Sequence, residues 1–218
     1  MLGDRNLLGL IEKAFGRLYE DLSIKVDKTN SDRIHALEAA ICTRLSYYER
    51  KDPIIPSDFS KISILLDQGM RHGLSNIKGE FHADSLTLEV TADMIVADEF
   101  VIRFEIVPEL PEVPHPRHLM YLNACLFALN KNDGFLIYLD GDGKTAQFSL
   151  TKNNRMFEEI IRRARVLSTL LKDNKVPIVE PSDLCIRCKY YERCFARERV
   201  KNSSGDLIGD LFGKLKGK

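Results

Sequence analysis

The amino-acid sequence lacks an overall charge and a long apolar run, and we expect no leader peptide. Its 32 lysine and arginine residues balance 32 aspartate and glutamate residues, so any attraction to nucleic acid has to come from a local patch. A transmembrane helix needs about 20 consecutive apolar residues, and no stretch of the sequence approaches that length. The apolar run from Leu7 to Ile11 is too short for a signal peptide, because Glu12 and Lys13 follow it directly. We therefore expect a cytoplasmic protein without a membrane partner, whose cysteines are ligands and not disulfides.

The length and composition are those of one globular domain. A chain of 218 residues can bury one hydrophobic core and does not require two domains. We expect a helical extension over residues 1–30, a single folded domain over residues 31–200 and a flexible tail over residues 201–218.

The hydrophobic pattern predicts helices and short strands in one chain. Apolar residues at helical spacing predict helices over residues 1–24, 31–48, 57–75, 117–129 and 154–172. Alternating or compact apolar runs predict strands over residues 86–90, 94–96, 101–106, 135–139 and 145–150. The fold class is therefore α/β in the broad sense, or α+β.

The chemically most informative stretch is a cysteine run near the C-terminus. Cys185, Cys188 and Cys194 are spaced C-x2-C-x5-C, and Cys42 lies far upstream. Thiolates suit zinc or the iron of a sulfide cluster. Zinc sites are usually built from two close pairs, which this spacing fits poorly. Spacing alone leaves zinc, an iron–sulfur cluster and simple reduced thiols open, and Cys42 by itself is typical of a small buried residue.

Two acidic residues fall on predicted neighbouring strands. Asp93 and Glu105 can meet around a hard divalent cation if both point inward; isolated acids on half-buried strands more often face solvent. His72 falls on the predicted helix over residues 57–75, on the side of its apolar residues. It is either a third metal ligand or a hydrogen-bonded core histidine.

With these residues in view, the chain resembles the CRISPR-associated RecB-type nucleases that carry an iron–sulfur cluster, members of the PD-(D/E)xK superfamily. The resemblance runs over residues 31–197 and includes the early Cys42-Thr43-Arg44 followed by Tyr47-Tyr48. It implies a restriction-endonuclease-like core with a central mixed sheet flanked by helices, and an iron–sulfur cap that joins the N- and C-terminal segments. The implied ligands of a [4Fe–4S] cluster are Cys42, Cys185, Cys188 and Cys194.

The resemblance also implies a hydrolytic metal site. Its histidine matches the end of Gly69-Met70-Arg71-His72, its aspartate matches Asp93 and its glutamate matches Glu105. In the family these residues hold Mn²⁺ or Mg²⁺, which activates water for hydrolysis of a phosphodiester bond.

The sequence departs from the nuclease pattern at the lysine. Val107 stands at the lysine position, and the helical Q-x-x-x-Y that follows aligns with Tyr121 to Cys125. Valine cannot position water or offset charge in the transition state, and loss of one such contribution typically costs about a hundredfold or more in rate. Arg103 shares a strand face with Glu105 and Val107, so it can bring a substitute positive charge to the pocket.

Three functions follow from these observations. One is a DNA-processing or DNA-binding protein of the CRISPR-associated family, in CRISPR spacer acquisition or DNA repair, with nuclease activity weakened or lost. A second is an active metal-dependent DNA exonuclease in which Arg103 and Glu105 are catalytic. A third is a zinc-bound interaction module. CRISPR adaptation proteins are the expected protein partners.

DNA, as single strands or ends, is the expected nucleic-acid partner. A local basic set surrounds the cysteine run, and Tyr190 and Tyr191 offer rings for base stacking. The alternative is that these charges only balance a negative cluster and that one tyrosine belongs to the core. The candidate DNA-binding residues are Arg187, Lys189, Arg193, Arg197, Arg199 and Lys201.

Overall fold

A computed structural model describes residues 26–54, 69–70 and 72–195. The predicted helix over residues 1–24, most of the predicted helix over residues 57–75 and the tail over residues 201–218 lie outside this range.

Within the described residues the strands form two mixed sheets. In the first, β3 (Leu86–Ala92) pairs in parallel with β1 (Arg33–His35) and antiparallel with β2 (Ile77–Ala83). The second has the order β4, β5, β6, β7, with the central pair β5–β6 parallel and both outer pairs antiparallel. Its strands are β4 (Met94–Val96), β5 (Phe100–Ile106), β6 (Asp133–Leu139) and β7 (Thr145–Thr151).

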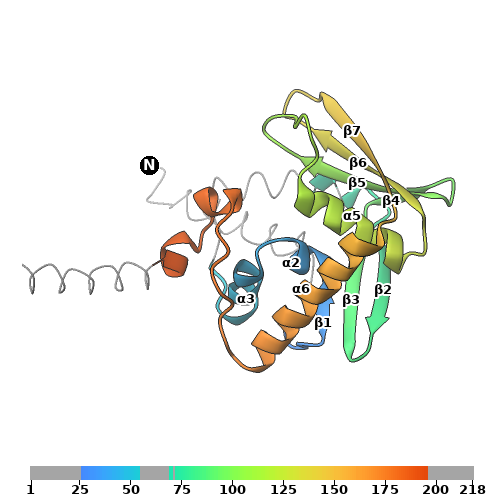
Figure 1. Cartoon of the computed structure of the whole chain (residues 1–218). Helices are drawn as coiled ribbons and strands as arrows, with labels where there is room; N and C mark the ends of the chain where they lie inside the picture. The colour runs from blue at the N-terminus through green and yellow to red at the C-terminus, as the bar shows by residue number, and fades with distance from the viewer. Residues whose placement is uncertain (1–25, 55–68, 71, 196–218) are drawn as a thin grey trace, which may run out of the picture.

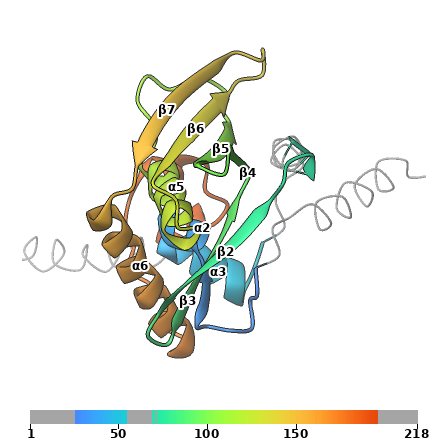
Figure 2. The same ribbon diagram turned by 90° about the vertical axis from the view of Figure 1, so that its right-hand side faces the viewer.

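The helices gather on one side of the strands (Figure 1). Helix α5 (Pro116–Ala128) connects the parallel strands β5 and β6, as a parallel pair requires. Figure 2 looks nearly along α5 and shows the strands passing over and beside it, with α6 (Asn154–Lys172) on its other flank. The N-terminal helices α2 (Ala36–Ala40) and α3 (Thr43–Lys51) also pack against α6.

The core lies between α5, α6 and the sheets. Alternate residues of β3 are buried, as expected for a strand with one face on the core. Helix α5 is buried nearly all round, which its apolar sequence predicts. Phe127 of α5 stacks on Phe157 of α6 with ring centroids 3.8 Å apart, and this contact helps to fix the two helices against each other.

The structure confirms some sequence predictions and corrects others. The predicted helices over residues 117–129 and 154–172 appear as α5 and α6, and the five predicted strands are present. The single helix predicted over residues 31–48 is wrong: Ile34 and His35 pair with β3, and the chain leaves helical geometry again at Ile41 and Cys42. Strand β2 was not predicted, although its burial alternates along the strand.

A buried ion pair holds the split N-terminal segment together. Arg50 of α3 donates from Nε and Nη2 to the carboxylate of Glu38 in α2, at 2.6 and 2.7 Å. Its remaining N–H groups donate to the backbone oxygens of Asp27, Asn30 and Arg33. All five guanidinium donors are thus used, and α3, which follows Cys42, is fixed against α2 and β1.

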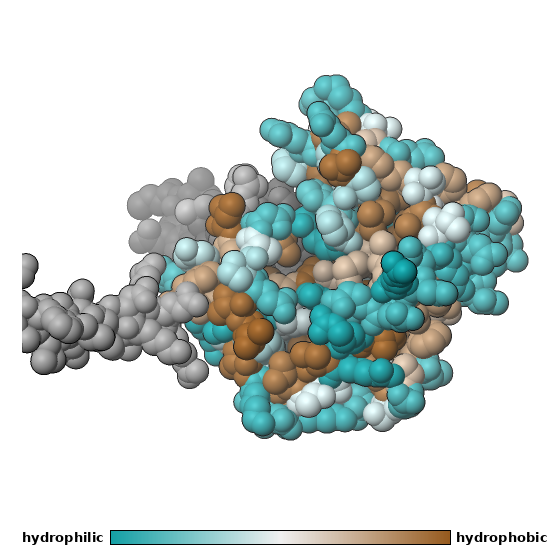
Figure 3. Space-filling model, viewed as in Figure 1, coloured by the Kyte–Doolittle hydropathy of each residue, from teal (hydrophilic) through white to brown (hydrophobic). Residues whose placement is uncertain are grey.

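The visible surface is mainly hydrophilic, with hydrophobic atoms gathered over the loop between α6 and the cysteine run (Figure 3). Val176 and Ile178 in this loop are exposed. None of the helices in the described ranges is both long and apolar enough to cross a bilayer.

Candidate functional site

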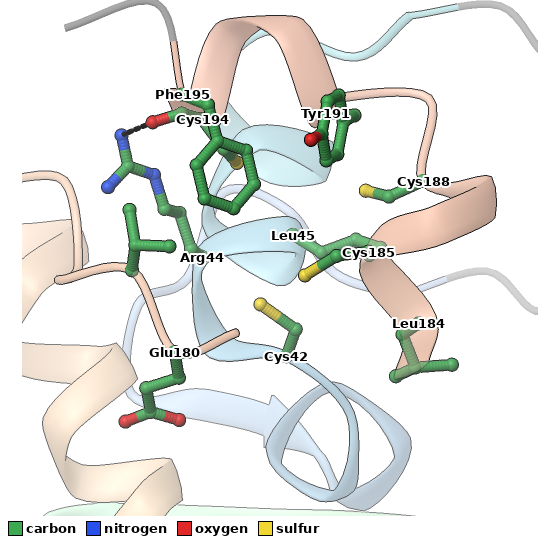
Figure 4. A pocket seen from close by; sticks show the side chains of 11 residues that line it. Cys42, Arg44, Leu45, Glu180, Leu184, Cys185, Cys188, Tyr191, Cys194 and Phe195 are labelled. Atoms are coloured by element: carbon green, nitrogen blue, oxygen red, sulfur yellow. Dashed lines mark hydrogen bonds between the residues drawn. The ribbon is translucent and has the colours of Figure 1, made fainter. Parts of the chain in front are cut away.

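The four candidate cysteines of the sequence come together around one pocket. Cys42, Cys185, Cys188 and Cys194 all line it, and in Figure 4 their sulfur atoms face a common space. The pocket is partly open to solvent. The remaining cysteine, Cys125, is fully buried in α5 and away from the pocket lining.

Each sulfur is presented by a different local structure. Cys42 is the residue that precedes α3, where the chain turns out of α2. Cys185 lies in the short 3-10 helix η1 (Asp183–Arg187), and Cys188 is the residue that ends it. Cys194 lies in the helical residues 191–195 and donates its backbone N–H to the carbonyl oxygen of Tyr190, at 2.9 Å. The pocket therefore joins the beginning of the described chain to its end.

The thiols of the pocket are partly withdrawn from water and influence one another. Burial raises the pKa of Cys188, and the neighbouring Cys42 and Cys185 raise it further. Burial also raises the pKa of Cys194, while the Arg44 guanidinium pulls it down. These effects favour neutral thiols, whereas a bound cation would reverse them by stabilising the thiolates.

Arg44 forms part of the wall between the cysteines and the core. Its Nη1 donates to the carbonyl oxygen of Pro177 at 3.2 Å, and its Nη2 donates to Tyr48 Oη at 3.3 Å and to the carbonyl oxygen of Cys194 at 3.5 Å. Figure 4 shows the last of these bonds. The Nε of Arg44 is buried, and it has no hydrogen-bond partner in the part of the chain that the structure describes.

The residues of the expected hydrolytic site are arranged differently from the prediction. Asp93 lies at the break between β3 and β4, and Glu105 lies on β5. Arg103 joins them: its Nη1 is 3.1 Å from Asp93 Oδ1, and its Nε is 3.0 Å from Glu105 Oε1. The side chains of Asp93 and Arg103 are only 1% and 4% exposed. The two carboxylates therefore do meet, and a guanidinium lies between them.

The surroundings of Arg103 keep it charged. Burial opposes its charged form, but Glu105, Tyr121 and Asp93 more than offset this and raise the pKa of Arg103. Its guanidinium carbon lies 4.7 Å from the centroid of the Tyr121 ring, within range of a cation–π interaction. The Tyr121 ring therefore forms part of the wall around Arg103.

A series of polar contacts runs from Glu105 to the segment over residues 183–195, which carries three of the four cysteines and is called the cysteine cap below. His118 of α5 has its Nε2 3.8 Å from Glu105 Oε2 and its Nδ1 3.0 Å from Tyr138 Oη. The neighbouring Arg117 donates from Nε to His118 Nε2 at 3.1 Å and from Nη1 to Asp183 Oδ2 at 3.4 Å. Asp183 begins the 3-10 helix that carries Cys185.

The metal triad expected from the resemblance is not assembled in the described ranges. His72, Asp93 and Glu105 are all described, but no group of three or more histidine, cysteine or acidic residues in those ranges is placed to hold a single metal ion. His72 is exposed, so the expectation that it points into the core is wrong. Val107 follows β5 and packs against the core, with its N–H bonded to the carbonyl oxygen of Leu139 at 2.9 Å.

The basic residues near the cysteines have partners within the protein. Lys189 Nζ pairs with Glu49 of α3 at 2.6 Å, and Arg193 Nη1 pairs with Asp52 at 2.7 Å. Of the two candidate stacking residues, Tyr190 is fully buried and Tyr191 is 43% exposed. These contacts bind the cysteine cap to α3. The side chain of Arg187 and the residues Arg197, Arg199 and Lys201 lie outside the described part.

Sequence reasoning missed Arg44 and Arg117 as parts of these sites. The signal for Arg44 was its place two residues after Cys42 in Cys42-Thr43-Arg44. Arg117 had no local signal, because its role depends on contacts with Asp183, 66 residues away.

Comparisons with known proteins identify the fold. No family model and no curated protein matches the sequence. The crystal structure of SSO0001 is similar, with a TM-score of 0.59 and 16% sequence identity over 83% of this chain and 93% of that one. An alkaline exonuclease (LHK-Exo) from Laribacter hongkongensis has a TM-score of 0.47 and 9% identity over 73% of this chain and 93% of that one. Its complex with dAMP has a TM-score of 0.44 and 12% identity over 65% and 88%.

The class that these findings establish is a mixed α/β fold. The likeness to SSO0001 shows a shared arrangement of helices on mixed sheets. On this fold the chain has a pocket lined by four cysteines and a buried arginine between two carboxylates.

Proposed function

We propose that the protein is a DNA-processing or DNA-binding member of the CRISPR-associated RecB-type family, with its nuclease activity weakened or lost. It would act in CRISPR spacer acquisition or DNA repair, with CRISPR adaptation proteins as partners. The observation that carries the loss of activity is the position of Arg103, between the two carboxylates that a catalytic metal would need.

A permanent cation and a divalent metal compete for the same negative charge. Hydrolysis in this nuclease class uses Mn²⁺ or Mg²⁺ to generate the attacking hydroxide and to offset charge on the phosphate. Arg103 satisfies Asp93 and Glu105 with direct hydrogen bonds, and a guanidinium does not deprotonate to leave. Since Val107 also replaces the lysine, two electrostatic contributions to the reaction are changed at once.

The four cysteines fit an iron–sulfur cluster. Thiolates are the usual protein ligands of such clusters, and Cys42, Cys185, Cys188 and Cys194 would hold one. The buried N–H of Arg44 beside these sulfurs suits a negatively charged centre. When bound, the cluster supplies a structural link between Cys42 and the cap and a centre that can take up one electron.

The DNA contact would lie on the cap and involve the basic set around the cysteines. Lys189 and Arg193 are partly exposed and already paired with Glu49 and Asp52, so they can share their charge with phosphate only in part. Tyr191, exposed beside the pocket, is the ring available for base stacking. Arg187, Arg197 and Arg199, proposed from the sequence as DNA-binding residues, lie outside the described side chains.

The test combines metal analysis with two DNA assays on one anaerobic preparation. We expect brown protein with about four iron and four sulfide per chain, as a [4Fe–4S] cluster requires. We expect single-stranded DNA to bind with a salt-dependent affinity and to remain intact with Mn²⁺. An R197A/R199A variant should bind DNA less tightly, with a shallower dependence on salt, because two phosphate contacts are removed.

Three results would contradict the proposal in different ways. Colourless protein with stoichiometric zinc would support the interaction module. Manganese-dependent degradation of DNA that Arg103→Ala abolishes would support the exonuclease in which Arg103 and Glu105 are catalytic. Absence of DNA binding by anaerobic, cluster-loaded protein would remove the nucleic-acid function.

A further inference from the structure

Arg44, which lines the pocket of the four cysteines, has one unused side-chain donor in the described part of the chain. Its two terminal nitrogens are fixed by Pro177, Tyr48 and Cys194, so the guanidinium cannot turn freely. Its Nε is buried without an acceptor in the described part of the chain. Because a buried, charged donor without an acceptor is strongly unfavourable, a structure that retains one requires an explanation.

The candidate acceptors for the Nε–H of Arg44 are the sulfur atoms in the pocket that Arg44 lines. Cys42, Cys185, Cys188 and Cys194 line the same space as the Arg44 side chain. Within the described residues, the hydrogen bonds of Arg44 are all to neutral oxygens. Its positive charge is therefore not cancelled by a directly bonded carboxylate, and it acts on whatever the cysteines bind.

The other cations near the cap are committed elsewhere. Arg193 pairs with Asp52, and its guanidinium carbon lies 4.2 Å from the centroid of the Tyr48 ring. Lys189 pairs with Glu49. Arg163 of α6 donates from Nε to the carbonyl oxygen of Ala39 at 2.6 Å and pairs with Glu180. Among the described arginines and lysines, Arg44 alone lines the pocket.

We propose that Arg44 donates its Nε–H to a sulfur of the cluster bound by the four cysteines and thereby makes that cluster easier to reduce. The inference rests on the proposed function, since it requires the cluster. The physical reason is electrostatic: one added electron makes the centre more negative, and a nearby positive donor stabilises that state more than the oxidised one. Hydrogen bonds to the sulfurs and the local charge are known controls of cluster potentials. Arg44 is a positioning and tuning residue, and it is not a ligand.

The test is an anaerobic redox titration of the full-length, cluster-loaded protein with dithionite as the electron donor. The ratio of reduced to oxidised cluster is followed by the visible absorbance and by electron paramagnetic resonance. At the midpoint potential of the wild type, we expect this ratio to fall about tenfold in Arg44→Met, which corresponds to 59 mV for a one-electron couple. Arg44→Lys keeps the charge but loses the planar donor, so its ratio should fall by about threefold.

Arg193→Met is the matched control. It removes an equal charge next to Cys194 from a residue that does not line the pocket, and we expect a change of less than about twofold because its charge is shared with Asp52 and solvent.

The outcomes separate the two proposals. Wild-type protein without iron and sulfide removes the proposed cluster and this inference with it. Suppose that the wild type contains the cluster but that Arg44→Met does not change its reduction potential, or changes it no more than Arg193→Met does. This result overturns the role of Arg44 and still supports the cluster. If circular dichroism shows that Arg44→Met does not fold, Arg44→Lys is used in its place. An unchanged ratio of reduced to oxidised cluster in Arg44→Lys then overturns the inference.

Discussion

Replacement of Arg103 by methionine tests the buried arrangement directly. Methionine keeps most of the aliphatic volume, so the main loss is the charge between Asp93 and Glu105. With contacts of 3.1 and 3.0 Å, each attraction is about 5 kcal/mol at an effective dielectric constant of about 20. The cost of desolvating the three groups offsets much of this. Removal of one member of such a buried set typically costs about 3–5 kcal/mol, and we expect Arg103→Met to lower the free energy of unfolding by that amount at pH 7.5.

The assay is equilibrium unfolding in urea, with and without added metal. Millimolar Mn²⁺ should stabilise Arg103→Met more than the wild type, since the paired carboxylates then attract a divalent cation and ligand binding to the folded state adds stability.

The matched control is Arg165→Met, because Arg165 pairs with Asp84 at 2.8 Å but both side chains are mostly exposed. Surface pairs contribute about 0–1 kcal/mol, so this variant should be close to the wild type. If Arg103→Met costs less than about 1 kcal/mol, which is within the surface range, or if Mn²⁺ stabilises the wild type equally, then Arg103 does not act as the internal cation of the site.

Three further predictions concern other parts of the fold. Burial, with the charges of Arg103 and Arg50, lowers the pKa of His35 from 6.5 to about 4. The unfolded chain therefore binds more protons than the native state between these two pH values. Unfolding in urea should show that the free energy of unfolding falls by up to about 3 kcal/mol from pH 6.5 to pH 4. His35→Asn should flatten this pH dependence, and an unchanged slope in the variant would contradict the prediction. Cys42→Ser should reduce the iron content and lower the melting temperature of the anaerobic protein, whereas Cys125→Ser should retain the iron; equal iron in both variants would exclude Cys42 as a ligand. Arg50→Met should destabilise by about 3–5 kcal/mol, because it leaves the Glu38 carboxylate buried without its cation, and a loss near that of Arg165→Met would show that the pair is dispensable.

Local pattern was sufficient for much of the secondary structure. Helices α5 and α6 follow from their apolar residues, and each strand that was predicted has β-branched or aromatic residues in a short run. The failure over residues 31–48 has a physical cause. Ile34 and His35 gain backbone pairing with β3, a contact across more than 50 residues that no local propensity can reveal.

For the candidate site too, the sequence predicted some features and not others. The spacing of Cys185, Cys188 and Cys194 and the early Cys42 indicated a shared thiolate site, and the structure brings the four together. Asp93 and Glu105 were also identified from their places on neighbouring strands. Arg103 was expected on the same strand face as Glu105, but its bond to Asp93 was not expected, because alternation along β5 gives the face of a side chain and not its partner outside that strand.

The sequence by itself determined the residue types and the helical and strand periods, since these are written in local order. Only the tertiary structure decided that Cys42 meets the other three cysteines, that Arg103 bridges two carboxylates and that Arg44 keeps a buried donor in the wall of the cysteine pocket. These facts depend on contacts between residues distant in the chain, whose energies are set by burial and distance and not by neighbours in sequence.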